Sequence, residues 1–178
     1  ESGIKPGDYT IRQLSFPYGS TWDRLGEYTK QALEQLGFKV NLESTDAGGW
    51  ASRTRNWDFD LTTNFTYQYG DPALGVLRLY ISSNIVKGSP FANVQGYSNP
   101  ETDKQWEAAA SEVDPAKRQA LYTQLQTTLV NEVANGFLVD MEFPTLYRAN
   151  VKNLVKTAIG LYESLHVLYI RKERPQDD

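Results

Sequence analysis

The side chains best suited to chemistry lie in the segment Asn64–Pro72, where aromatic and polar residues alternate in the order Asn-Phe-Thr-Tyr-Gln-Tyr-Gly-Asp-Pro. Tyrosine rings can stack on a ligand, and their hydroxyl groups can make hydrogen bonds, as can the amide of Gln68. In an extended backbone, Phe65, Tyr67 and Tyr69 share one face. This composition predicts a ligand-binding surface that begins at Asn64 and includes Phe65, Tyr67, Gln68 and Tyr69. The alternative is that these rings pack in the core or under a lid.

A second candidate surface lies around two tryptophans. Trp50 and Trp57 flank Arg53 and Arg55. The wall of a cleft that stacks on rings and pairs with a ligand carboxylate has this composition, so Trp50 and Arg53 are candidate ligand contacts. The alternative, which short charged helices favour, is a surface helix with solvated arginines and buried indoles.

Residues for acid–base catalysis are sparse. His166 is the sole histidine, and Ser164 near it does not stand in a Gly-x-Ser-x-Gly setting. Asp58 and Asp60 would share one face of a strand, where general acid–base work is conceivable. A small α/β hydrolase using Asp58, Asp60 or His166 is therefore the alternative hypothesis for function. A third hypothesis is an adaptor that docks another protein through an exposed patch around Trp50 or Trp57.

The composition excludes several classes of protein. Lysine and arginine number 18 against 22 acidic residues, with mixed signs along the chain, so no basic stripe for nucleic acid is present. Cysteine is absent, which excludes disulfides, thiol catalysis and thiolate zinc sites. With one histidine, no metal site and no cofactor are expected. No stretch approaches the roughly 20 apolar residues that span a bilayer. The polar start has no secretion signal and is expected to be a loop within a larger protein.

The elements that must position these residues begin with a strand, helix and strand at 9–16, 20–36 and 38–42. Such a crossover is almost always right-handed and joins parallel strands. A short helix at 47–56 and a third strand at 58–66 follow. The prediction is an α/β fold with a mostly parallel sheet flanked by helices. Ligands bind such sheets outside the carboxyl ends of the strands, which is where Asn64–Pro72 begins.

The second half is predicted to be mainly helical, with starts at Asp71-Pro72, Pro100 and Asp114-Pro115. The first of these helices is expected to reach Tyr80. Apolar positions at helical spacing are Trp106, Ala109, Ala110 and Val113 in the second helix and Leu121, Leu125 and Leu129 in the third. Strands are predicted at 137–141 and, more weakly, at 145–149 and 167–171. Residues 1–171 are expected to form a single α/β lobe, and 172–178 a charged flexible tail.

Five segments follow one another along the chain in an order that is typical of one protein family: Ala32–Val40 (ALEQLGFKV), Trp57–Leu61 (WDFDL), Gly70–Pro72, Gly96–Asp103 (GYSNPETD) and Asp114–Tyr122 (DPAKRQALY). In this order they resemble the C-terminal lobe of family 5 extracellular solute-binding proteins, the peptide/nickel-type receptors of ABC importers. The resemblance runs from about Tyr9 to Arg171. Each segment alone is moderately specific, but the ordered set makes chance similarity improbable.

The resemblance implies a lobe of periplasmic-binding-protein type II, without enzymatic activity. It would close on a small solute together with the N-terminal lobe of the same protein and deliver the solute to an ABC permease in the membrane. The implied location is periplasmic or extracellular, with or without a lipid anchor. An oligopeptide or a related compound is the implied solute.

One position departs from the family pattern. Peptide-binding members pair the ligand's α-ammonium with an aspartate three residues before the Asp-Pro aspartate, and Gln68 occupies that position here. A glutamine can hydrogen-bond but cannot neutralise a cation. The substitution favours a sugar-like compound, an opine or a modified peptide over a peptide with a free amino terminus.

Overall fold

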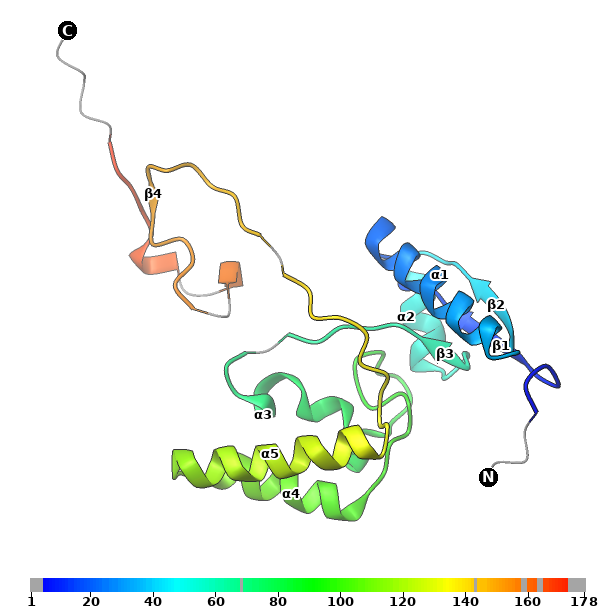
Figure 1. Ribbon diagram of the computed structural model, residues 1–178. Coiled ribbons are helices and arrows are strands. Elements are labelled where there is room, and N and C mark those ends of the chain that lie inside the picture. The colour runs from blue at the N-terminus through cyan, green and yellow to red at the C-terminus, as the bar shows by residue number, and fades with distance from the viewer. Residues whose placement is uncertain (1–4, 68, 143, 158–159, 163–164, 173–178) are drawn as a thin grey trace, which may run out of the picture.

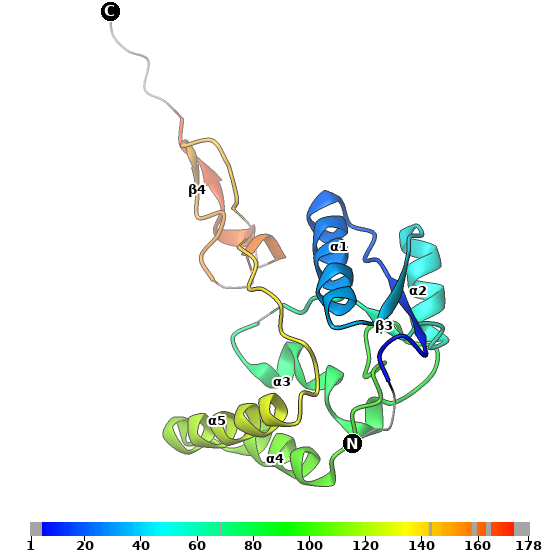
Figure 2. The same cartoon turned by 45° about the vertical axis from the view of Figure 1, so that its right-hand side comes forward.

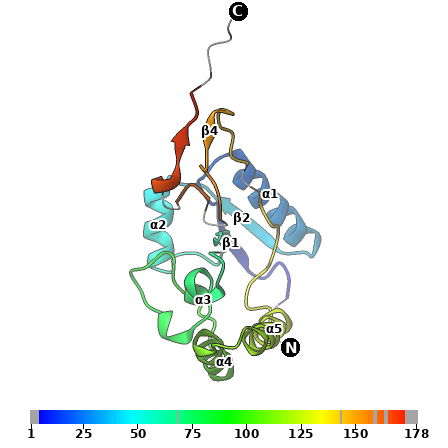
Figure 3. The same ribbon diagram turned by 90° about the vertical axis from the view of Figure 1, so that its left-hand side faces the viewer.

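The first half of the chain contains a three-stranded parallel sheet in the computed structural model. The structure describes residues 5–67, 69–142, 144–157, 160–162 and 165–172. Its strands are β1 (Thr10–Leu14), β2 (Lys39–Glu43) and β3 (Leu61–Thr62), in the order β2-β1-β3. The central β1 pairs in parallel with both neighbours. Helix α1 (Ser20–Gln35) covers one face of the sheet and α2 (Ala47–Arg55) the other (Figure 3). The predicted α/β fold, with a mostly parallel sheet flanked by helices, is confirmed.

Aromatic side chains join these layers. Leu14, Phe16, Trp22 and Trp50 form a buried cluster around the end of β1. The ring of Phe16 meets both indoles edge-on, with centroids 4.8 Å from Trp22 and 4.9 Å from Trp50. Edge-to-face pairs of this kind contribute about 0.5–1.5 kcal/mol beyond the area that they bury. Phe16 therefore links α1 and α2 at the edge of the sheet where a ligand is expected.

Helix α1 differs in detail from the prediction. It begins after Gly19, whose φ is 102°, and no side chain caps its first turn. Tyr28 and Leu36 share the helical spacing of the buried Trp22, but both are exposed. The three-stranded sheet is narrow, and therefore only part of the apolar stripe finds a surface to cover.

Strand β3 is much shorter than the predicted strand at 58–66. The carboxylate of Asp60 accepts a hydrogen bond from the main-chain N–H of Arg12 at 2.8 Å, and the main-chain N–H of Asp60 donates to the Arg12 carbonyl at 3.0 Å. A side chain thus occupies a donor that a longer ladder would use, and regular pairing starts only at Leu61.

The second half is helical, with α3 (Pro72–Gly75), α4 (Pro100–Ser111) and α5 (Pro115–Asn131). Asp71, Asn99 and Asp114 cap these helices through their side chains, as expected for residues before a helical proline. The helix predicted to reach Tyr80 is divided into α3 and a 3₁₀ turn (Leu77–Leu79), and another turn (Ser82–Asn84) follows. α4 and α5 pack side by side around a second core of Tyr80, Trp106, Leu125 and Leu129 (Figure 1).

Two residues predicted to face this core lie outside it. Ala110 is exposed, and Val113 is 91% exposed because α4 ends at Ser111, before the valine. None of the helices in the described part of the chain has the length and apolarity needed to cross a membrane.

The segment after α5 is the least regular part of the described chain. No strand forms at 137–141 or 145–149, and Phe137 and Val139 are exposed. A β3 of two residues offers too short an edge to pair with the apolar run. Instead, β4 (Val151–Lys152) and β5 (Tyr169–Ile170) form an antiparallel hairpin, so the weak prediction at 167–171 holds in part. Figures 1 and 2 show this hairpin standing apart from the parallel sheet.

The helical core makes a first prediction. Leu125 is 1% exposed, so Leu125→Ala should lower the free energy of unfolding by about 2–5 kcal/mol through lost burial and a residual cavity. Leu121→Ala should cost less because that side chain is half-buried. Val113→Ala is the matched surface control and should stay within about 0.5 kcal/mol of the parent. Urea denaturation measures all three, and equal losses at 113 and 125 would contradict the packing described.

Candidate ligand-binding site

The candidate site lies where β1 and β3 end. Because these strands are adjacent and parallel, the segments that follow them meet at the same edge of the sheet. The rings of Phe16, after β1, and Phe65, after β3, lie 5.5 Å apart between centroids. The segment predicted after the third strand thus has a neighbour at this edge, namely the segment with Phe16 and Tyr18 that follows β1.

Four rings form a continuous series at this edge, here called the aromatic ladder: Phe16, Phe65, Tyr67 and Tyr69. From Phe65 to Tyr67 the centroids are 5.1 Å apart and the rings nearly perpendicular, and from Tyr67 to Tyr69 they are 5.7 Å apart and inclined by 32°. Burial falls from Phe16, at 1% exposed, through a half-buried Phe65 to Tyr67, at 38%, and Tyr69 beyond it is half-buried. The ladder therefore leads from the core to the surface.

The residues predicted in Asn64–Pro72 divide according to this gradient. Phe65 packs against the core cluster and also against Trp22, at 5.5 Å between centroids. The amide oxygen of Asn64 accepts a hydrogen bond from the main-chain N–H of Phe65 at 2.8 Å, which shapes the turn into the ladder. Tyr67 and the half-buried Tyr69 stay the strongest candidates for contact with a ligand. Gln68 lies outside the described residues.

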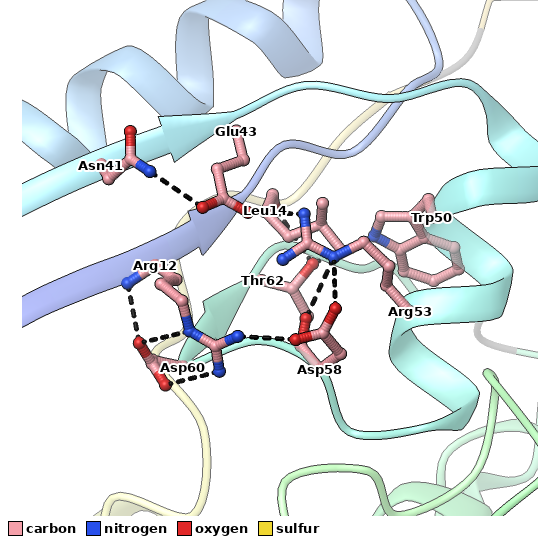
Figure 4. A network of polar contacts seen from close by, with 9 residues as sticks. All are labelled: Arg12, Leu14, Asn41, Glu43, Trp50, Arg53, Asp58, Asp60 and Thr62. Carbon is pink, nitrogen blue, oxygen red and sulfur yellow. Dashed lines mark hydrogen bonds and ion pairs between the residues drawn. The ribbon is translucent and has the colours of Figure 1, made fainter.

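Trp50 is a core residue, and its predicted place on a cleft wall is wrong. Its indole is 1% exposed and donates a hydrogen bond to the hydroxyl oxygen of Thr62 at 3.0 Å. That hydroxyl group in turn donates to the Leu14 carbonyl at 3.0 Å, which fixes α2 against β1 and β3 (Figure 4). The alternative interpretation, a buried indole, applies to Trp50, and the adaptor hypothesis loses one of its two anchors.

Arg53 is engaged by two carboxylates. Its guanidinium lies 2.5 Å from Glu43 and 3.1 Å from Asp58 (Figure 4). These contacts place Arg53 in a charged network on the α2 face of the sheet. Its predicted pairing with a ligand carboxylate stays untested.

The same network accounts for the two aspartates of the hydrolase hypothesis. Arg12 donates to Asp58 at 2.6 Å and to both oxygens of Asp60, through Nε at 3.2 Å and Nη2 at 3.1 Å (Figure 4). Hydrogen bonding from Arg12 lowers the pKa of each carboxyl group, so both stay ionised and neither is suited to act as a general acid.

His166, the third residue of that hypothesis, lies elsewhere. It belongs to a 3₁₀ turn (Leu165–Val167) of the C-terminal hairpin, which stands apart from the sheet carrying Asp58 and Asp60 (Figure 1). The hydrolase hypothesis is therefore unsupported. Across the described residues, no three histidine or acidic side chains gather into a possible metal site.

The Arg12 network predicts a pH-dependent stability. Because the folded-state pKa values of Asp58 and Asp60 lie below 3.8, the network stabilises the fold above that pH and its contribution is lost as the pH falls through the folded values. Arg12→Gln should therefore lower Tm most near neutral pH, and its deficit should shrink below pH 3.8. Arg55→Gln is the matched control, since Arg55 bonds only a main-chain carbonyl in the contacts described. Thermal unfolding followed from acid to neutral pH measures this, and a deficit independent of pH would contradict it.

Asp71 holds the far end of the ladder. Its carboxylate accepts hydrogen bonds from the Ala73 N–H and the Tyr122 hydroxyl, each at 2.9 Å, and lies 2.6 Å from Arg118. Although burial opposes it, these partners lower the pKa of Asp71. One carboxylate thus caps α3 and ties the end of the ladder segment to α5, here called the Asp71 latch. An opening of about 480 Å³ lies beside it, bordered by Gly70, Arg118 and Gln119.

Gly75 was missed by the sequence analysis. It is buried in α3, and a Cβ atom at this position would lie 2.4 Å from the Tyr67 carbonyl oxygen and 3.1 Å from the Tyr69 ring. A glycine in a four-residue helix carries no sequence signal of such an approach. Tyr18, by contrast, could have been found by applying the strand-end rule to β1.

Gly75→Ala should displace the ladder. The added methyl group would meet backbone, which cannot move aside cheaply, so we expect a loss of about 1–3 kcal/mol in the free energy of unfolding and a shifted Tyr67–Tyr69 segment. Near-ultraviolet circular dichroism reports the tyrosine environment, and chemical denaturation reports stability. Leu74→Ala, at a 72% exposed neighbour, is the control. An unchanged spectrum with unchanged stability would show that the approach is looser than described.

Comparisons with known proteins agree with this architecture, although no family model matches the chain. It is 26% identical over 146 residues to the probable D,D-dipeptide-binding periplasmic protein DdpA of Escherichia coli (strain K12), covering 80% of this chain and 28% of that protein. It is 26% identical over 155 residues to the glutathione-binding protein GsiB of Pectobacterium atrosepticum, covering 84% and 29%. The chain thus spans less than a third of the length of these relatives.

Solved structures with the same fold include three binding proteins. The oligopeptide-binding protein AppA of Bacillus subtilis, in complex with a nonapeptide, matches with TM-score 0.58 and 21% identity over 75% of this chain and 26% of that one. MoaA of A. tumefaciens R10, in complex with mannopinic acid, matches with 0.59 and 22% over 70% and 25%. A mannohexaose-bound periplasmic oligopeptide-binding protein of Thermotoga maritima matches with 0.61 and 18% over 71% and 24%.

The resemblance to the family 5 extracellular solute-binding proteins is thus confirmed: the chain has the fold of their type II lobe and is similar to such proteins over most of its length.

Proposed function

We propose that this chain is one lobe of the substrate-binding component of an ABC importer, and that it holds a small solute against the exposed end of the aromatic ladder. The aromatic ladder carries the proposal, because it brings rings from the core to the edge of the sheet where α/β folds bind ligands. The names of the relatives and of the similar structures describe binding proteins. The proposed activity is binding without chemical conversion.

The proposal includes a second lobe. A single lobe can contact only one side of a solute, whereas binding sites bury about 70–90% of a small ligand. We therefore propose that residues 1–171 form one lobe of a longer two-lobed protein, with 172–178 as a tail, and that hinge closure encloses the solute. The low coverage of the relatives supports this organisation. The proposed location is periplasmic or extracellular, and the proposed receiver of the solute is a membrane permease.

Calorimetric titration tests the proposal. The longer protein and the 178-residue chain are each titrated with short peptides, neutral oligosaccharides and nickel chelates. We expect at least one solute to bind the longer protein, the chain alone to bind it far more weakly, and the solute to be recovered unchanged. Conversion of a solute, or no binding of any solute to the longer protein, would refute the proposal.

A further inference from the structure

We infer that the part of the solute held by this lobe is uncharged and ring-shaped, and that its chemical class is a neutral oligosaccharide. The inference rests on the proposed function and names the substrate class for the same site.

The first observation is the absence of charge from the two segments that meet at the candidate site. Residues 15–22 follow β1 and residues 63–70 follow β3, and neither contains an aspartate, glutamate, lysine, arginine or histidine. The sequence at 63–70, Thr-Asn-Phe-Thr-Tyr-Gln-Tyr-Gly, offers rings, hydroxyl groups and amides. A charged group of a solute would therefore find no counter-charge in the segments that carry the ladder.

The second observation is that two carboxylates at this edge, those of Asp71 and Glu43, are already paired. Asp71, next to the segment 63–70, is held by Arg118 and by the Tyr122 hydroxyl. Glu43, at the carboxyl end of β2, is held by Arg53. Breaking such a pair to engage a solute would leave its other member partly desolvated and unpaired, which is costly.

The third observation is the shape of the exposed rings. The exposed Tyr67 and the half-buried Tyr69 lie 5.7 Å apart between centroids and are inclined by 32°, and Tyr18 adds a second exposed ring after β1. Flat rings of this kind bury the apolar C–H faces of a sugar, while tyrosine hydroxyl and amide groups can hydrogen-bond its hydroxyl rim. A peptide with free termini would instead require partners for two charges.

The test is calorimetric titration of the longer protein with cellopentaose and mannohexaose, and with penta-alanine carrying free termini, at low and high salt. We expect an oligosaccharide to bind with a Kd that changes less than about twofold with salt, because no ion pair is formed. Tyr67→Ala should weaken it about tenfold or more, and Tyr67→Phe should keep affinity within about threefold, because stacking is retained. Tyr28→Ala, on an exposed part of α1, is the control.

Each other result overturns the inference. Tighter binding of penta-alanine, a strong loss of affinity with salt, or an affinity indifferent to Tyr67→Ala would show that charge or other residues select the solute. In those cases a solute still binds, so the proposed function stands. Binding of a nickel chelate alone likewise refutes only the sugar. Absence of binding by every solute tried, including the peptides and chelates above, refutes the proposed function itself.

Discussion

Replacing Trp50 with alanine is expected to lower the free energy of unfolding by about 3–5 kcal/mol. The substitution removes a ring that is 1% exposed and packs against Phe16. It also removes the hydrogen bond that the Thr62 hydroxyl oxygen accepts from the indole N–H. Since the same indole joins α2 to the sheet, the loss should appear as one cooperative transition at lower denaturant concentration. Urea denaturation followed by circular dichroism measures it.

Trp57→Ala is the matched control for this experiment. Trp57 is 38% exposed, lies at φ 61°, and contacts Lys87, whose amino group is 5.1 Å from the ring centroid. An exposed cation–π contact contributes about 0.5–1 kcal/mol, so this variant should lose far less than Trp50→Ala. Similar losses for the two tryptophans would mean that Trp50 does not hold the core together.

The double variant Tyr67→Ala/Tyr69→Ala is expected to weaken solute binding by the longer protein about a hundredfold, because tyrosines are over-represented among the few residues that carry most of the binding energy. Stability should change little, since Tyr67 is exposed and Tyr69 half-buried. Titration with the solute identified for the parent protein measures the first effect, and thermal unfolding the second.

Two outcomes separate the roles of these rings. Loss of affinity with an intact fold identifies Tyr67 and Tyr69 as ligand contacts. A collapsed fold would assign both rings to the core, which is the alternative stated in the sequence analysis. Phe65→Ala is a useful comparison, because Phe65 packs on Phe16 and Trp22 and should lose stability as well.

The local parts of the fold could be predicted from the sequence. The strand, helix and strand of the first crossover were predicted near their observed positions, and the Asp-Pro pairs at Asp71 and Asp114 marked two helix starts. These signals depend on residues close together in the chain. The ordered segments then indicated the solute-binding-protein fold.

The remaining features depend on partners distant in sequence. The length of β3 is limited by Asp60 bonding to Arg12, 48 residues away. The burial of Trp50 follows from its hydrogen bond to Thr62 and its contact with Phe16, and the role of Gly75 follows from its approach to Tyr67. A residue pattern cannot reveal these contacts, which is why Trp50 was assigned to the wrong surface and Gly75 to none.

The Asp71 latch has a mechanical consequence. Because the carboxylate that caps α3 through the Ala73 amide also binds Tyr122 and Arg118 of α5, the segment with Tyr67 and Tyr69 cannot swing away from α5 without opening both contacts to that helix. The segment with Tyr67 and Tyr69 is thus expected to move together with α5 as one rigid body during any domain motion. Bending of the chain would then be concentrated outside the Asp71 latch. Slow amide hydrogen exchange at Ala73 would show that the latch stays closed.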